Sequence, residues 1–208
     1  MRVLIVTLAV VLCDQATKVA VRGGEIPFLG VAWKGMDYGT SLPVLGDWLK
    51  ITFIENPNMA FGIQLAGQYV LVLFSAIAAL GVIWYLYRHR HGALPLRLAL
   101  ALVLAGAVGN LIDRSLYGVV YGYAPLFQGH VVDFIDLDLF RIRWGDWVFK
   151  VWPIFNIADA AVTVGVVLLL FTMKPQHAER NEETAANPMP GKEAAGQPVE
   201  SQPDDESG

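Results

Sequence analysis

The stretch Tyr69–Tyr87, YVLVLFSAIAALGVIWYLY, decides the fold class of this chain. It is apolar along its whole length and contains no Asp, Glu, Lys, Arg or His. An α-helix needs about 20 consecutive, mainly apolar residues to cross the hydrocarbon core of a bilayer. The stretch therefore predicts a transmembrane helix.

Three further segments come near the same length: Val3–Val21, Leu94–Ile112 and Trp152–Met173. Of the 208 residues, 55% are hydrophobic and 16% are charged, and the mean hydropathy is +0.47. This composition is typical of membrane proteins. We therefore expect an α-helical polytopic membrane protein with four transmembrane helices.

The orientation follows from the basic residues between the second and third predicted spans. These residues are Arg88, His89, Arg90, His91 and Arg97, and no acid lies among them. Short loops rich in Lys and Arg lie in the cytoplasm. Four spans then place both termini in the cytoplasm and two loops, about 22–68 and 113–151, on the outside.

The C-terminal segment differs in composition from the rest of the chain. Residues 175–208 hold eight acids against Arg180 and Lys192, a balance of −6, whereas the whole chain has a net charge of −4. The segment is rich in Pro, Gly, Glu, Ala and Gln and has no apolar periodicity, so it cannot bury enough surface to order itself. We expect a membrane domain over residues 1–174 and a disordered cytoplasmic tail over 175–208.

The outer loops carry the sequence signals of strands. Leu49–Ile54 mixes β-branched and aromatic residues with partial alternation, and Val131–Phe140 and Trp144–Val151 carry similar signals. A small extracytoplasmic β-sheet is therefore expected. Asp136 and Asp138 have fewer apolar constraints than Asp133 and are interpreted as solvated loop charges.

Two motifs near the outer ends of the third and fourth spans combine acids with amides. GNLIDR places Asn110, Asp113 and Arg114 on one helical face, where they could orient one another or simply close the helix end as an ion pair. FNIAD places Asn156 and Asp159 at i and i+3. Charged groups near hydrocarbon are costly and typically functional. In the structural alternative, Asp159 merely pairs with a neighbouring cation, Arg114 or Lys18.

Two further motifs precede these in the chain. DQATK in the first span places Asp14 and Lys18 at i and i+4, which favours a helical ion pair that anchors the structure. ENPNMAFG follows the first predicted strand and offers Asn56 and Asn58 in a predicted turn. Turn chemistry alone would also explain these asparagines.

In their order along the chain, DQATK, ENPNMAFG, GNLIDR, VVDF and FNIAD resemble the motifs of the lipoprotein signal peptidases, also called signal peptidase II, over about residues 1–174. The resemblance implies an aspartic endopeptidase of the bacterial inner membrane that cleaves prolipoproteins before their diacylglyceryl-modified cysteine. Its catalytic pair would be Asp133 and Asp159, facing the extracytoplasmic side. It also implies an outer β-cradle, contact with membrane lipids and inhibition by globomycin-type compounds.

The resemblance extends to the residues around this pair. Four polar residues match positions that line the substrate pocket of the family: Asn56, Asn110, Arg114 and Asn156. Asp14, Lys18 and Asp113 match positions that support the pocket. The chain departs from the family at Asn58, where glycine is common, and at Ser115–His130, which is longer than the usual connection.

Two close carboxylates in a poorly solvated site share one proton, so one can accept a proton from water while the other polarises a carbonyl. We expect no metal and no cofactor, because the histidines lack HExxH spacing, and we expect no nucleic-acid partner. A different class remains possible on the residues alone: a small ion- or proton-coupled transporter subunit that uses the acids as a relay. The second span offers no polar group for such a path, which favours the peptidase over it. A noncatalytic membrane scaffold would leave the paired acids unexplained.

Overall fold

The computed structural model describes residues 2–26, 30–57, 67–138, 141–144, 147–150 and 152–172. Residues 1–172 form one compact unit. The predicted tail over 175–208 lies outside the described residues and stays a prediction, as does the domain boundary at residue 174.

Among the described residues, three helices are long and apolar enough to cross a membrane, and a fourth apolar helix is shorter. The first two of these helices begin and end within one residue of the spans predicted from the sequence. The described helices of this group are α1 (Leu4–Arg22), α2 (Gln68–Arg88), α3 (Leu94–Ile112) and α5 (Ile157–Thr172). Their outward side chains are large and apolar, as lipid-facing residues are: Phe74 is 70% exposed and Phe171 is 81% exposed.

Helix α3 ends at Ile112, as the sequence predicts for the third span, but the backbone stays helical beyond it. A π-helical segment, Asp113–Tyr117, continues it into α4 (Gly118–Val120). The long connection then folds back, because the backbone N–H of Phe127 donates to Ser115 O at 3.0 Å and that of Gly129 to Arg114 O at 2.9 Å. The Ser115–His130 segment therefore extends the third helix and closes a compact turn against it.

The fourth helix begins at Ile157, and the expected helical start at Trp152 is wrong. Phe155, two residues before the helix, is extended and forms a β-bridge with Ile135. Its N–H donates to Ile135 O at 3.1 Å, and its carbonyl accepts the N–H of Ile135 at 2.7 Å. A backbone paired in this way with a strand is unavailable to a helix.

The strands form three antiparallel sheets rather than the single sheet expected. The largest has the order β3–β4–β5, and two hairpins, β1–β2 and β6–β7, accompany it. Leu49–Ile54 and the segment from Val131 are strands as predicted, whereas Trp144 ends one strand instead of beginning another. The strands are β1 (Gly24–Ile26), β2 (Val31–Trp33), β3 (Ser41–Leu45), β4 (Leu49–Asn56), β5 (Val131–Leu137), β6 (Arg141–Trp144) and β7 (Trp147–Lys150).

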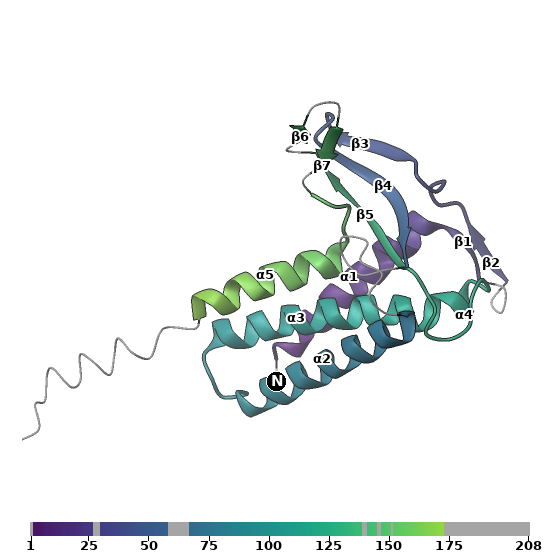
Figure 1. Ribbon diagram of the computed structural model, residues 1–208. Helices are drawn as coiled ribbons and strands as arrows, with labels where there is room; N and C mark the ends of the chain where they lie inside the picture. Colours follow the sequence, from purple (N-terminus) through teal and green to yellow (C-terminus); the bar gives the residue numbers. More distant parts are fainter. Residues whose placement is uncertain are drawn as a thin grey trace, which may run out of the picture. The chain divides into compact units, whose positions relative to one another are not determined.

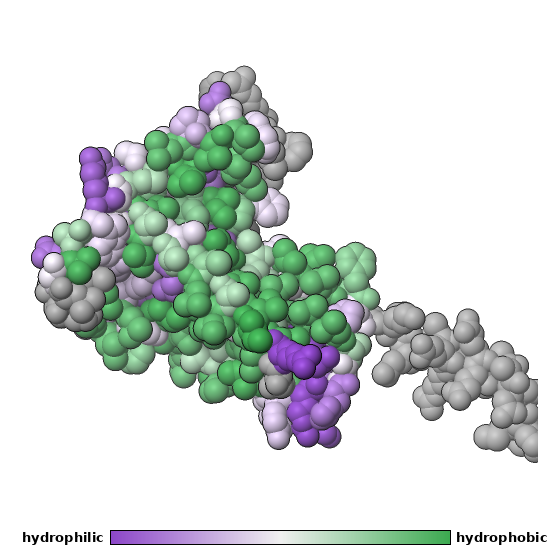
Figure 2. Space-filling model, turned by 180° about the vertical axis from the view of Figure 1, so that it is seen from behind, coloured by the Kyte–Doolittle hydropathy of each residue, from purple (hydrophilic) through white to green (hydrophobic). Residues whose placement is uncertain are grey.

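Helix α3 is the centre of the helical part, where it packs against α1, α2 and α5 (Figure 1). The β3–β4–β5 sheet rises from the end of this bundle at which α3 passes into α4. The α2–α3 turn and the end of α5 lie at the other end. Figure 2 shows apolar residues over most of the visible helical surface and hydrophilic residues gathered near the α2–α3 turn.

Close contact of α3 with α1 and α5 depends on two glycines of α3, Gly106 and Gly109. A Cβ at Gly106 would collide with the carbonyl oxygen of Ala158. One at Gly109 would lie 2.7 Å from Asp14 Oδ2 and 3.1 Å from Ala158 Cβ. These glycines therefore bring α1, α3 and the first turn of α5 together at one level, next to the sheet.

Candidate active site

Asp159 lies at the start of α5 in a reciprocal capping arrangement. The side-chain oxygen of Asn156 accepts the backbone N–H of Asp159 at 2.9 Å, and Asp159 Oδ2 accepts the backbone N–H of Asn156 at 3.3 Å. This is a capping box, in which the residue before the helix and its third residue satisfy each other's amides. The N-terminal end of a helix also favours negative charge. The local sequence thus fixes an acid at the mouth of α5.

Asp133 reaches the same place from β5. Its side chain is buried, with a residue exposure of 3%, and it accepts hydrogen bonds from Asn56 at 3.2 Å and from Asn156 at 2.7 Å. Burial, and then the nearby charge of Asp159, raises the pKa of Asp133 from 3.8 to about 7. Asp133 therefore holds a proton near neutral pH far more readily than an ordinary aspartate.

Asn110 of α3 connects Asp159 to a buried cation. Its amide nitrogen donates to Asp159 Oδ1 at 2.8 Å, while its carbonyl oxygen accepts from Lys18 Nζ at 2.9 Å and from the Asn156 amide at 3.2 Å. The ammonium group can only donate, so it determines which end of the Asn110 amide faces Asp159. The Asn110 amide is thereby oriented as a donor to Asp159.

Lys18, which donates to Asn110, also joins α1 to the segment after α3 through a fully buried network of ion pairs. Lys18 Nζ lies 2.8 Å from Asp14 and 2.6 Å from Asp113, and all three side chains are inaccessible. Gln15 donates to Asp113 at 2.8 Å and accepts from the Tyr117 hydroxyl at 3.1 Å. The predicted Asp14–Lys18 pair is confirmed, and Gln15 and Tyr117 are members that the sequence analysis missed.

Asp14 also accepts a hydrogen bond from the backbone of α5. Its Oδ1 accepts the backbone N–H of Ala158 at 2.9 Å, a contact buried inside the protein. The first amides of a helix have no partner within the helix. A carboxylate of α1 therefore satisfies an amide of α5, which explains why a buried acid is retained there.

The expected grouping of Asn110, Asp113 and Arg114 on one face is only partly correct. Asp113 faces Lys18, whereas Arg114 lines the pocket on the other side. Consecutive helical residues point about 100° apart, and this separates the two charges. Within the described residues the short ion pairs of Lys18 are with Asp14 and Asp113, and Asp159 is held by Asn110 instead of by a cation.

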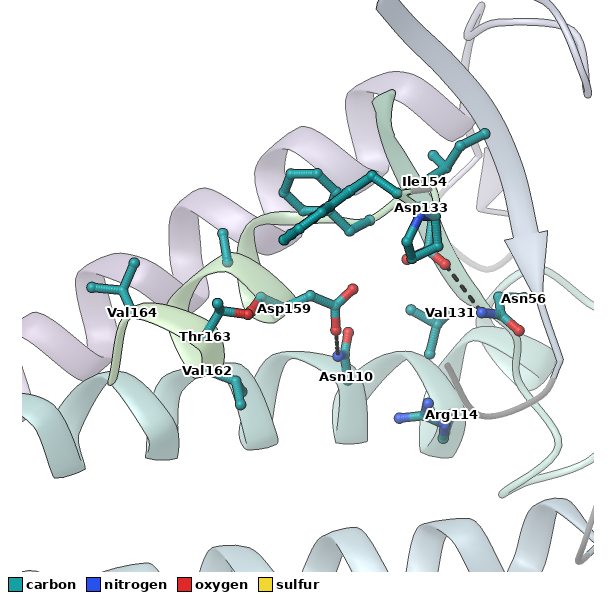
Figure 3. A pocket seen from close by; sticks show the side chains of 14 residues that line it. Asn56, Asn110, Arg114, Val131, Asp133, Ile154, Asp159, Val162, Thr163 and Val164 are labelled. Carbon is teal, nitrogen blue, oxygen red and sulfur yellow. Dashed lines mark hydrogen bonds between the residues drawn. The ribbon is translucent and has the colours of Figure 1, made fainter. Parts of the chain in front are cut away.

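A pocket of about 620 Å³ joins these groups. Figure 3 shows Asp133 and Asp159 on two sides of one opening, with Asn110 on α3 and Arg114 on the π-helical segment that follows it beside the opening. Arg114 Nε is buried and has no hydrogen-bond partner among the described residues. The remaining lining is largely apolar and comes from β5, the 152–155 segment and α5: Val131, Trp152, Pro153, Ile154, Phe155, Ala160, Val162, Thr163 and Val164.

Two sequence expectations about loop residues are wrong. Asp136 is 8% exposed and accepts a hydrogen bond from Thr52 at 2.8 Å, so it is a buried strand residue and not a solvated charge. Asn56 ends β4 instead of lying in a turn. Asn58 and the rest of 58–66 lie outside the described residues.

The arrangement gives one pocket two acids with different surroundings. Asp159 accepts two hydrogen bonds at a helix start, and Asp133 is buried with a raised pKa. Such a difference separates a proton acceptor from a proton donor. The pocket also has a polar end, where Arg114 Nε has no hydrogen-bond partner among the described residues, and an apolar wall. Such a site suits an amphipathic substrate.

Comparisons with known proteins agree on one family. A family profile described as "Signal peptidase (SPase) II" matches residues 6–174. The "Lipoprotein signal peptidase" of Chlorobium phaeobacteroides (strain DSM 266) is 39% identical over 131 residues, 62% of this chain and 71% of that protein. That of Porphyromonas gingivalis (strain W83) is 35% identical over 155 residues, 61% of this chain and 68% of that protein.

Two solved structures have a similar fold. One, described as "Bacterial membrane enzyme structure by the in meso method at 2.3 A resolution", has a TM-score of 0.62 and is 28% identical, covering 92% of this chain and 93% of that chain. The other, with the same description at 1.9 Å, has a TM-score of 0.62 and is 30% identical, covering 83% of this chain and 92% of that chain.

Proposed function

This chain belongs to the signal peptidase II family, and we propose that Asp133 and Asp159 are the catalytic pair by which it works as an aspartic endopeptidase. It is a multi-pass bacterial membrane peptidase that removes signal peptides from prolipoproteins. The single observation that carries the proposal is the junction at Asn156. This side chain hydrogen-bonds Asp133 and caps the turn that holds Asp159, so acids from β5 and α5 meet at the polar end of the pocket.

In the proposed reaction the two acids have different roles. Asp159, at the start of α5, accepts a proton from a water molecule that attacks the scissile carbonyl. Asp133, protonated because its pKa is raised to about 7, donates to the carbonyl oxygen as the tetrahedral intermediate forms. The proton accepted by Asp159 then passes to the leaving amine, and Asp133 takes back a proton from the hydroxyl group as the intermediate collapses to the carboxylate product.

Arg114 and the amides bind the peptide on either side of the cut bond. Asn56 and Asn156 hydrogen-bond Asp133, and Asn110 hydrogen-bonds Asp159. Arg114 lies in the pocket with a buried Nε that has no partner among the described residues. A fixed guanidinium there suits a peptide carbonyl, which would supply the missing acceptor.

The apolar wall of the pocket suits a lipidated substrate. Cleavage before a diacylglyceryl-modified cysteine places acyl chains in the bilayer beside α5 while the peptide meets the polar end. Each buried methylene group contributes about 0.8 kcal/mol to membrane partitioning. Globomycin-type inhibitors, which are expected from the family resemblance, would occupy the same pocket.

The proposed topology has four spans, with both termini in the cytoplasm and the site on the extracytoplasmic side. It is supported by the hydrophilic α2–α3 turn at the end of the bundle opposite the sheet, together with the positive-inside rule. Helix α5 has 16 residues and is shorter than the other spans. The extended 152–155 segment before it would lengthen the crossing.

The transporter alternative is not supported. The family assignment points to a peptidase, and Lys18 forms one closed network of ion pairs with Asp14 and Asp113. Helix α2 contributes no charged residue before Arg88. A relay path through the membrane would need polar groups along its whole depth.

The decisive experiment is conversion of a diacylglyceryl-modified prolipoprotein by the purified protein. We expect cleavage before the lipidated cysteine by the wild type and none by Asp159→Asn. The same precursor without its lipid should be cleaved far more slowly. Equal activity on both precursors would contradict the proposed specificity and favour a general intramembrane protease.

A further inference from the structure

A cluster of charged and aromatic side chains lies next to the site, yet none of its members is needed for the chemistry described above. Glu55 precedes Asn56 on β4, and His130 precedes Val131 at the start of β5. In the β4–β5 register Glu55 opposes Val132 and Asn56 opposes Val131. Because successive strand residues point to opposite faces, Glu55 lies behind the face on which Asn56 meets Asp133.

Glu55 is the centre of the cluster, and both of its oxygens are engaged. Oε1 accepts from Arg22 Nε at 3.0 Å, and Oε2 lies 3.3 Å from His130 Nδ1. The side chains are largely buried, with exposures of 20% for Glu55, 15% for Arg22 and 32% for His130. One carboxylate thus joins the end of α1, the end of β4 and the start of β5.

Two tyrosines from the turn that follows α4 complete the cluster. The Arg22 guanidinium lies 3.6 Å from the ring centre of Tyr121 and 5.4 Å from that of Tyr123. The Tyr123 hydroxyl accepts the backbone N–H of His130 at 2.8 Å, and the two rings are 5.3 Å apart. Burial raises the pKa of both tyrosine hydroxyls, so they stay neutral. The 115–130 segment therefore supplies three of the five members of the cluster: Tyr121, Tyr123 and His130.

We propose that Glu55 is a positioning residue that clamps Asn56 against Asp133, and that protonation of His130 tightens this clamp. The inference rests on the proposed function, because it concerns the hydrogen bond from Asn56 to the proposed catalytic Asp133. Neutral His130 donates one ordinary hydrogen bond to Glu55 from Nδ1. Protonated His130 donates a charge-assisted one, which is about twice as strong.

The charges around His130 favour this response. Glu55 of β4 is the anion that faces its ring, Tyr123 of the preceding turn is neutral, and Arg22 of α1 is held on the other oxygen of Glu55. Histidine is the side chain that ordinarily changes charge between about pH 5 and pH 8. The clamp is therefore stronger when both ring nitrogens of His130 carry a proton than when the ring is neutral.

The test compares His130→Asn with the wild type. Asparagine places an uncharged N–H donor near the position of Nδ1, so it keeps the bond to Glu55 but cannot titrate. We expect the ratio of kcat at about pH 6 to kcat at about pH 8 to fall about threefold in the variant, with KM unchanged, because one partly exposed bond is no longer strengthened. His89→Asn in the α2–α3 turn is the matched control and should keep the wild-type ratio.

Hydrogen exchange of the β4 and β5 amides in the intact protein gives a readout that does not depend on cleavage. After correction for intrinsic rates, protection should be greater near pH 6 than near pH 8 in the wild type, and equal at both in His130→Asn. If protection responds but no precursor is cleaved, the clamp stands and the proposed function fails. If precursor is cleaved while neither protection nor the kcat ratio differs from wild type in His130→Asn, the clamp is refuted.

Discussion

Asp133 and Asp159 are connected through one side chain, that of Asn156. Its amide nitrogen donates to Asp133 Oδ1 at 2.7 Å, and its carbonyl oxygen accepts the backbone N–H of Asp159 at 2.9 Å. An asparagine amide has distinct donor and acceptor ends. The same side chain can therefore hold a strand acid and a helix acid in one relative position only.

This connection predicts that the two acids fail together. Asp133→Asn and Asp159→Asn should each abolish cleavage while the protein remains inserted, and the double variant should be no worse than either, because residues that act as a unit are not additive. Initial rates on a lipidated precursor measure this. Asp136→Asn, on the same strand but hydrogen-bonded to Thr52, is the control and should keep most activity. Near-wild-type turnover in either single variant would disprove the assignment.

Arg114 is expected to contribute through its geometry as well as its charge. Arg114→Ala should lower kcat/KM by about 100-fold, the usual effect of losing one positioned donor in a reaction site. Arg114→Lys should recover part of this, because a point charge lacks the planar fork. Arg97, in the first turn of α3 far from the site, offers a matched alanine control. Full activity of Arg114→Lys would show that charge alone suffices.

The raised pKa of Asp133 makes a prediction about stability. An acid whose pKa is higher in the folded state weakens folding as it ionises. The penalty is absent below the ordinary value of 3.8, grows up to about 7 and is complete above that. Asp133→Asn should therefore stabilise the protein near pH 8 relative to pH 4, by about 1–4 kcal/mol. Unfolding in detergent at both pH values tests this, and a difference between variant and wild type that does not change with pH would contradict it.

The buried network of α1 and α3 should be essential for folding. Lys18→Met keeps most of the side-chain volume but leaves Asp14 and Asp113 as buried charges without their cation. Breaking a buried ion pair in this way costs about 3–5 kcal/mol. Lys50→Met, which removes a 3.5 Å pair with the fully exposed Asp47, should change stability by less than about 0.5 kcal/mol. Similar melting of the two variants would refute the prediction.

The C-terminal segment should be dispensable. Deletion of residues 176–208 should leave insertion and turnover essentially unchanged, because the proposed topology places this acidic segment a membrane thickness from the site. Cleavage of a lipidated precursor by membranes that contain the truncated protein measures it. A large loss of turnover would argue against both termini being cytoplasmic.

The sequence predicts those parts of the fold that depend on local pattern. The apolar runs place α1 and α2 to within one residue, and the alternation at Leu49–Ile54 locates β4. The start of α5 could not be found in this way, because Phe155 is withdrawn from the helix by a backbone pair with Ile135, distant in sequence. Helix patterns do not contain that partner.

The candidate site shows the same division. Motif order identified Asp133, Asp159 and their amide neighbours, whereas the partners of each residue depended on tertiary packing. Asp113 pairs with Lys18 of another helix instead of with its neighbour Arg114. Asp136 is buried by a strand pairing that its local sequence does not show. The sequence therefore names the polar residues, and the fold decides which of them meet.

The glycine contacts between α3 and α5 limit how a substrate can enter. A Cβ at Gly165 would lie 2.8 Å from Ala99 O, and one at Gly106 would collide with Ala158 O, so the two backbones already touch along this seam. Separating these two helices to admit a substrate would expose their backbones to lipid. We therefore expect a membrane-borne precursor to enter past Trp152, which lines the pocket and is half-exposed. The contact between α3 and α5 would then stay closed during substrate entry, and the precursor would enter on the side of the pocket that faces the sheet.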